Sequence, residues 1–162
     1  MSELSLLSTS LKPVELLGST GPRLWTPPLR ELTPETSYGF DVIDFARDVL
    51  STPLDPWEEW TVIHGGELLP DGRPRFRVLL ILVARQNGKT LLARVLTLFW
   101  MFVENIPLTL AMNATLGYAR EQWAICCEIA TTNPHLKPEL GIVGSRRGSR
   151  PITSAPGTEE LR

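Results

Sequence analysis

The chain has 162 residues, about the length of one domain, and its 43% hydrophobic and 21% charged residues exclude a fully disordered, collagenous or disulfide-stapled protein. Lys and Arg total 16 against 18 Asp and Glu, and with a net charge of −2 the chain as a whole has no cationic field for nucleic acid or anionic membrane. The longest apolar stretch, residues 95–103, is far shorter than the ~20 residues of a membrane span, and the Met1-Ser2-Glu3 start lacks the basic region of a signal peptide, so we expect a cytoplasmic protein.

Residues 1–37 predict an extended, flexible arm. They hold five of the 14 prolines and show no helical or alternating period: Pro13, Pro22, Pro27, Pro28 and Pro34. From Phe40 the pattern becomes helical, with an apolar stripe made of Val42, Ile43, Ala46, Val49 and Leu50. Asp41, Asp44 and Asp48 share the opposite side, which favours a solvated face over a metal site. The helix is expected to end at Ser51-Thr52-Pro53.

A second helix is predicted from Asp55-Pro56 to Gly65-Gly66. Asp55 suits the N-cap, Pro56 the first helical position and Glu58 the third, where it completes a capping box. Residues 70–74 then form a turn, because they contain Asp-Gly between two prolines. Residues 76–83 are an almost unbroken apolar run of strand length, which predicts a strand buried on both faces of a parallel sheet.

The rest of the chain predicts two more helices and one more strand. A helix is expected from Lys89 to Glu104, a short strand over 108–112, and a helix from Tyr118 to Thr131 whose buried stripe is Ala119, Trp123, Cys126 and Ala130. The adjacent Cys126 and Cys127 are expected to be reduced thiols, because their spacing fits neither a loop-closing disulfide nor a zinc site. The resulting order is a βαβα unit, so we predict an α/β fold with a parallel sheet, preceded by two helices and the arm.

The loop between the first predicted strand and its helix carries the strongest functional signal. It reads Ala84-Arg85-Gln86-Asn87-Gly88-Lys89-Thr90 and matches the end of the nucleotide-binding pattern G-x-x-x-x-G-K-[ST], although Val83 occupies the position of the first glycine. In that pattern the glycine lets the backbone approach phosphate, the lysine reaches the β- and γ-phosphates, and the Thr90 hydroxyl ligates Mg²⁺. Arg85 is either a solvated loop charge or a second cation for the phosphates.

This loop resembles the deviant Walker A motif of the large terminase subunits of tailed bacteriophages. The segment 54–60 is similar to their adenine-contact motif, 68–77 to the linker before their first strand, and 118–123 to the helix after their second strand. The resemblance implies an incomplete P-loop NTPase over residues 38–140, the ATP-binding part of a motor that packages viral DNA into procapsids. It implies ATP and Mg²⁺ as cofactors, and as partners double-stranded viral DNA, a portal protein and a small terminase subunit. The full-length family members combine this ATPase with a nuclease and can form a homo-oligomeric ring.

Carried over by residue, the resemblance implies that Arg85, Gln86, Asn87, Gly88, Lys89 and Thr90 surround the phosphates, and that Pro56, Trp57 and Glu58 lie near adenine. Glu58 stands where the family has glutamine, and an ionised carboxylate can only accept hydrogen bonds. A capping role for Glu58 and an adenine contact are both open. For Trp57 and Trp60, packing of the helix is favoured over stacking on a base.

The distribution of acidic residues indicates that this chain lacks catalytic acids. All five aspartates lie in the first 71 residues, and none of the glutamates after Lys89 follows an apolar strand that could supply a second acidic motif. We therefore expect a fragment or a frameshifted chain, with residues 141–162 as an irregular basic tail whose arginines offer only non-specific attraction to DNA. His64 and His135 are expected to cap helices or face solvent. The alternative function is a prophage remnant that binds nucleotide without hydrolysis or binds another protein.

Overall fold

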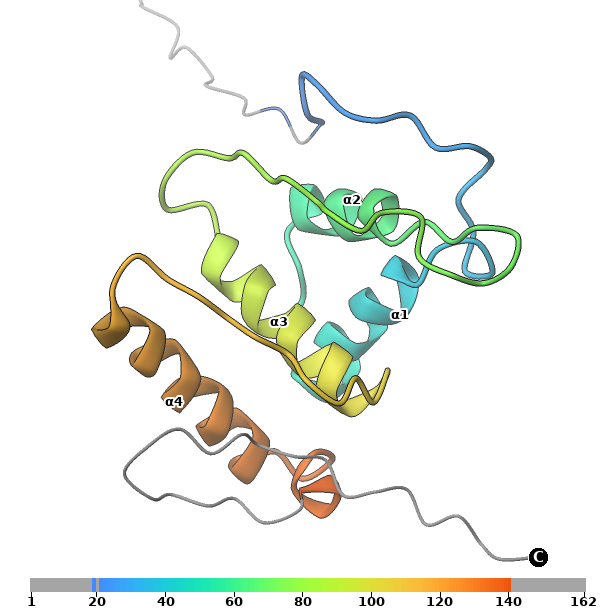
Figure 1. The fold of residues 1–162 in the computed structure, drawn as a ribbon. Helices are drawn as coiled ribbons and strands as arrows, with labels where there is room; N and C mark the ends of the chain where they lie inside the picture. The colour runs from blue at the N-terminus through green and yellow to red at the C-terminus, as the bar shows by residue number, and fades with distance from the viewer. Residues whose placement is uncertain (1–18, 20, 141–162) are drawn as a thin grey trace, which may run out of the picture.

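The computed structural model describes residue 19 and residues 21–140. The predictions for the first part of the arm and for the basic tail 141–162 lie outside these residues. The described chain is helical and contains α1 (Gly39–Asp44), the π-helical turn η1 (Phe45–Val49), α2 (Pro56–Gly65), α3 (Lys89–Phe102), α4 (Leu116–Thr132) and the 3₁₀ turn η2 (Lys137–Glu139) (Figure 1). No helix in this part of the chain is long and apolar enough to cross a membrane.

The predicted helices are confirmed, and their local signals are visible in the structure. The carboxylate of Glu58 accepts a hydrogen bond from the backbone N–H of Asp55 at 2.9 Å, which is one half of the predicted capping box at the start of α2. The side chain of Thr115 accepts from the N–H of Tyr118 at the start of α4. The predicted helix after Phe40 starts as α1 and continues as η1 up to Val49, and Asp41, Asp44 and Asp48 are exposed, as expected for a solvated face.

The core lies between the four helices. Most of its buried side chains come from α1 and η1, from α2, from α3 and from α4, and the segments between helices add Leu54 and Leu136. The helix residues are Val42, Phe45, Ala46, Val62, Leu92, Val95, Leu98, Phe99, Cys126 and Ala130. Helix α1 packs against α2 and α3, and α3 packs against α4, so α1 and α3 connect the outer helices α2 and α4 (Figure 1). A Cβ at Gly39 would lie 2.2 Å from the carbonyl oxygen of Val62, so only glycine lets α1 approach α2 this closely. Trp123, predicted to be buried, is 39% exposed.

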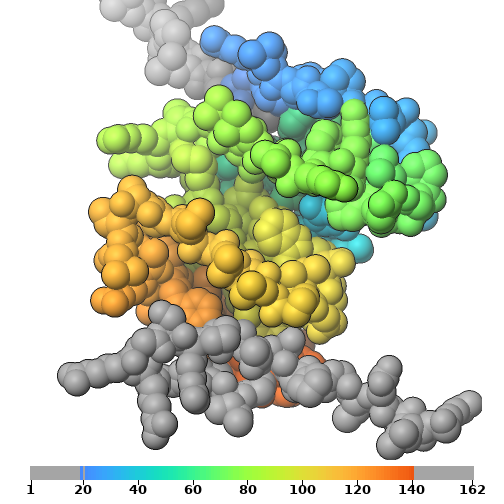
Figure 2. All heavy atoms as spheres, in the orientation of Figure 1, coloured from blue at the N-terminus to red at the C-terminus, as the bar shows by residue number. Residues whose placement is uncertain are grey.

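The α/β prediction, a parallel sheet built on a βαβα unit, is wrong for the described residues. Residues 76–83 and 108–112 are extended but belong to no strand, and the only β-type contacts in this part of the chain are the isolated bridges Ser37–Glu67 and Leu68–Pro74. Most of the apolar side chains expected inside a sheet are exposed. Leu80 is 79% exposed, Leu82 86% and Leu110 80%. Figure 2 shows atoms of both segments on the visible face of the molecule.

The physical reason is that a strand is defined by its neighbours. An apolar run of strand length indicates an extended, apolar segment, but a sheet forms only where a second segment completes the ladder of backbone hydrogen bonds. Here the two candidate segments do not pair, and the helices bury one another instead. The side chain of Ile81 still packs against the edge of the helical core.

Candidate functional site

The loop 84–90 turns the extended segment into the N-terminus of α3. Gly88 is the N-cap of this 14-residue helix and has a left-handed backbone with φ of 77°, and Gln86 has φ of 64°. The Gly88 carbonyl accepts hydrogen bonds from the N–H groups of Leu91 and Leu92, at 2.7 and 3.1 Å, which starts the helix. The first N–H groups of a helix have no acceptor within it and carry a partial positive charge, so this turn has the chemistry of an anion site.

Lys89, the first residue of α3, is folded back over the loop. Its ammonium group donates hydrogen bonds to the carbonyl oxygens of Val83, at 2.9 Å, and Ala84. The side chain is exposed, and these two acceptors are neutral, so an anion in the loop would compete for the same ammonium with full charge. Thr90 is half-buried beside it, whereas Arg85, Gln86 and Asn87 are exposed.

The structure brings the N-terminus of α2 to this loop. A Cβ built at Gly88 would lie 2.5 Å from Oε1 of Glu58 and 3.8 Å from Cζ2 of Trp57. Pro56 is the first residue of the same helix. Two segments that the sequence singled out separately, the loop and the start of α2, therefore meet at Gly88. For Arg85, the solvated charge and the phosphate ligand both stay predictions.

The Glu58 carboxyl group is fully buried at this junction. Oε2 accepts the capping hydrogen bond from Asp55, whereas Oε1 has no hydrogen-bond partner within the described structure. Burial raises the pKa of Glu58, the hydrogen bond from the Asp55 backbone opposes this, and the negative charge of Asp55 adds to the rise. The predicted capping role is confirmed. The sequence gives no signal that the second oxygen lies against Gly88.

The tryptophans of α2 have packing roles. Trp57 contacts the hydrophobic core. The ring of Trp60 stacks on His64 at a centroid distance of 3.7 Å, and Trp25 from the arm meets both rings edge-on, at 5.3 and 5.2 Å. His64 also contacts the Trp60 carbonyl oxygen through Nδ1 at 2.8 Å. Sequence reasoning missed Trp25, whose only signal was an aromatic residue inside a proline-rich segment.

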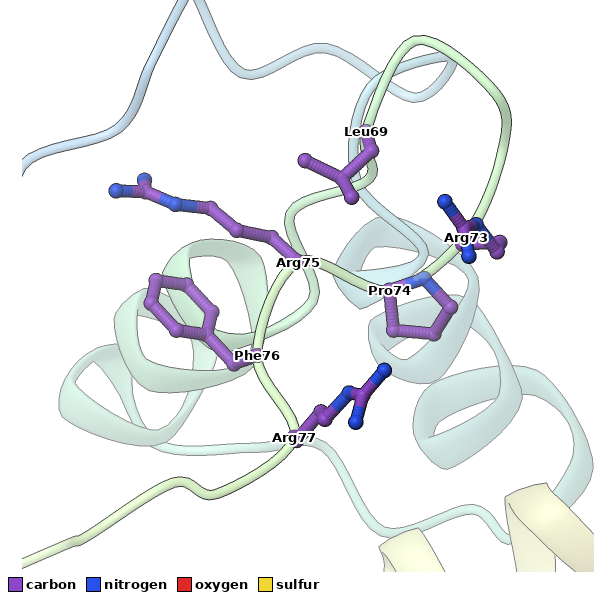
Figure 3. Close-up of a pocket in the computed structure, with 6 residues that line it drawn as sticks. All are labelled: Leu69, Arg73, Pro74, Arg75, Phe76 and Arg77. Atoms are coloured by element: carbon purple, nitrogen blue, oxygen red, sulfur yellow. The ribbon is translucent and has the colours of Figure 1, made fainter.

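A hollow lies over residues 69–77, where the turn after α2 leads into the extended run. It is lined by Leu69, Arg73, Pro74, Arg75, Phe76 and Arg77 (Figure 3). Arg73 is paired with Asp71 at 2.6 Å, and Arg75 with the buried Glu67 at 2.5 Å. Because two of its three arginines already have carboxylate partners, this hollow is weaker as an anion site than the N-terminus of α3.

Within the described residues, no group of three or more His, Cys, Asp or Glu side chains is placed to hold a metal ion. The Mg²⁺ expected at Thr90 and the absence of catalytic acids both stay predictions. Comparison of the chain with protein-family models, with curated proteins and with solved structures finds no match.

Proposed function

We propose that the loop 84–90 and the N-terminus of α3 bind the phosphates of ATP. The observation that carries this proposal is the left-handed Gly88 at the start of a long helix, followed directly by Lys89. Such a terminus offers backbone N–H groups and the positive end of the helix dipole, and the lysine adds a mobile cation. The site depends on a helix N-terminus and its loop, and no parallel sheet is part of the proposal.

The same proposal assigns roles to the neighbouring residues. Lys89 binds the β- and γ-phosphates, Thr90 ligates Mg²⁺ that accompanies the nucleotide, and Arg85 supplies a second cation. Pro56 and Trp57 lie on the side of the base, and Glu58, whose Oε1 lies against Gly88, is nearer the phosphates. By its resemblance the chain is then the ATP-binding part of a phage terminase large subunit, with viral DNA, a portal protein and a small terminase subunit as partners of the motor.

A binding experiment tests this proposal. A fluorescent ATP analogue with Mg²⁺ is expected to bind the wild-type chain, and Lys89→Ala is expected to weaken binding at least about tenfold, because a charge-assisted contact to phosphate contributes roughly 1.5–3 kcal/mol. Lys137→Ala is the matched control, since Lys137 lies in η2 and is exposed. Equal affinity of wild type and Lys89→Ala, or no binding by either, contradicts the proposal.

A second candidate function, a protein-interaction module, has its own observation. The extended segments present large apolar side chains to solvent, such as Leu80, Leu82, Leu110 and Met112, and surfaces of this kind mark sites of protein contact. The two candidates differ in one readout. An interaction module without nucleotide binding shows no response to the ATP analogue, and purified portal protein or small terminase subunit binds it equally with and without ATP.

A further inference from the structure

The carboxyl group of Glu58 lies beside the start of α3. The Glu58 side chain is fully buried, and its Oε1 is aimed at Gly88 and has no hydrogen-bond partner within the described structure. The other oxygen is fixed by the Asp55 N–H, so the carboxyl group cannot turn away without losing the cap of α2. A carboxylate held at a helix N-terminus occupies the same positive field that a phosphate would use.

We propose that Glu58 sets the phosphate affinity of this site, because its carboxylate opposes a polyphosphate bound at the N-terminus of α3. The inference rests on the phosphate binding proposed above and names the residue that limits its affinity. Two like charges in a water-poor junction repel more strongly than on an open surface. The opposition grows with the charge of the ligand, so Glu58 disfavours a triphosphate more than a monophosphate.

The other charged groups around Glu58 do not cancel its charge. On its own helix the neighbouring charge is Asp55, which is also negative. On the loop that packs against it, the charged side chains are Arg85, which is exposed, and Lys89, whose ammonium is bonded to the carbonyl oxygens of Val83 and Ala84. No ion pair joins Glu58 to a cation in the part of the chain that the structure describes.

The experiment compares neutral variants of Glu58 with the wild-type chain at about pH 8, where an ordinary carboxyl group is ionised. Glu58→Gln keeps an oxygen for the Asp55 N–H and removes the charge. It is expected to bind a fluorescent ATP analogue about three- to tenfold more tightly, with a smaller gain for the corresponding AMP analogue. Glu58→Met gives a second neutral side chain of similar length. Glu59→Gln is the matched control, since it removes one negative charge from the next position of α2.

Each outcome of this comparison either supports or overturns the inference. Tighter triphosphate binding by Glu58→Gln and Glu58→Met than by the wild-type chain, with Glu59→Gln unchanged, supports the inference. If both Glu58 variants bind like wild type while Lys89→Ala still weakens binding, the phosphate site stands and the role of Glu58 is overturned. An equal gain for the AMP and ATP analogues also overturns it. If no variant binds, the proposed function fails as well.

Discussion

Position 88 favours glycine, for two independent reasons. Its φ of 77° is a left-handed conformation that costs other residues about 1–2 kcal/mol, and a Cβ there would lie 2.5 Å from the buried Glu58 oxygen. Gly88→Ala is therefore expected to lower the free energy of unfolding by at least about 1–2 kcal/mol, measured by urea denaturation, and to abolish binding of the ATP analogue.

The control for this substitution is Gly117→Ala in the first turn of α4. A Cβ at Gly117 meets nothing within 4 Å, so alanine is expected to leave stability unchanged or to raise it by up to about 1 kcal/mol. The double variant Glu58→Ala/Gly88→Ala separates the two causes, because it removes the close contact and keeps the backbone strain. A Gly88→Ala protein as stable as wild type would contradict the described conformation.

Some features of the candidate site could be predicted from the sequence, and others could not. The Gly88-Lys89-Thr90 turn follows from a local pattern, and the structure places it at a helix N-terminus as expected. The contact between Glu58 and Gly88 could not be derived from spacing, because it depends on how α2 packs beside the loop. The folded-back position of Lys89 could not be predicted from the sequence either, because its acceptors are backbone carbonyl groups, which every residue has.

At the scale of elements, the arm depends on a few polar contacts. The carboxylate of Glu67 is buried, with 1% of its surface exposed, and accepts hydrogen bonds from the backbone N–H of Leu29 at 2.8 Å and from Arg75 at 2.5 Å. Arg75 also donates to the carbonyl oxygen of Pro27 at 2.9 Å. The described part of the arm is thus attached to the segment after α2, although its composition predicted flexibility.

Glu67→Ala is expected to lower the free energy of unfolding by about 3 kcal/mol, because it leaves the largely buried Arg75 without its carboxylate. Limited trypsin digestion is expected to cleave the variant faster at Arg23 and Arg30, since the arm loses its anchor. Asp71→Ala serves as the control. It breaks the exposed pair with Arg73, for which we expect no measurable change. Unchanged protease resistance of Glu67→Ala would contradict this anchoring role of Glu67.

The elements also show why the helices were predictable and the sheet was not. Caps, prolines and the 3.6-residue period act within a few residues. Nearby residues therefore determine the start of α2 at Pro56 and the end of α4 before Asn133-Pro134. A sheet depends on pairing between distant segments. The apolar residues of 76–83 and 108–112 satisfied the local pattern without such a partner.

For the whole molecule, the fold is a helical core with apolar extended segments on its outside. This arrangement and a parallel sheet predict different changes in the free energy of unfolding for the same substitutions. Leu98 is fully buried in the centre of α3, and Leu98→Ala is expected to lower the free energy of unfolding by about 2–5 kcal/mol. Leu80→Ser and Leu82→Ser replace side chains that are 79% and 86% exposed, and each is expected to change it by less than about 0.5 kcal/mol.

Urea denaturation followed by circular dichroism measures all three variants under the same conditions. In a parallel sheet covered on both faces, Leu80 or Leu82 would be as costly to replace as Leu98, because either substitution would place a hydroxyl group in the core. A loss of several kcal/mol at Leu80 would therefore contradict the helical arrangement. A neutral effect at Leu80 and Leu82, with improved solubility of the two serine variants, would identify the extended segments as surface that folding of this chain does not use.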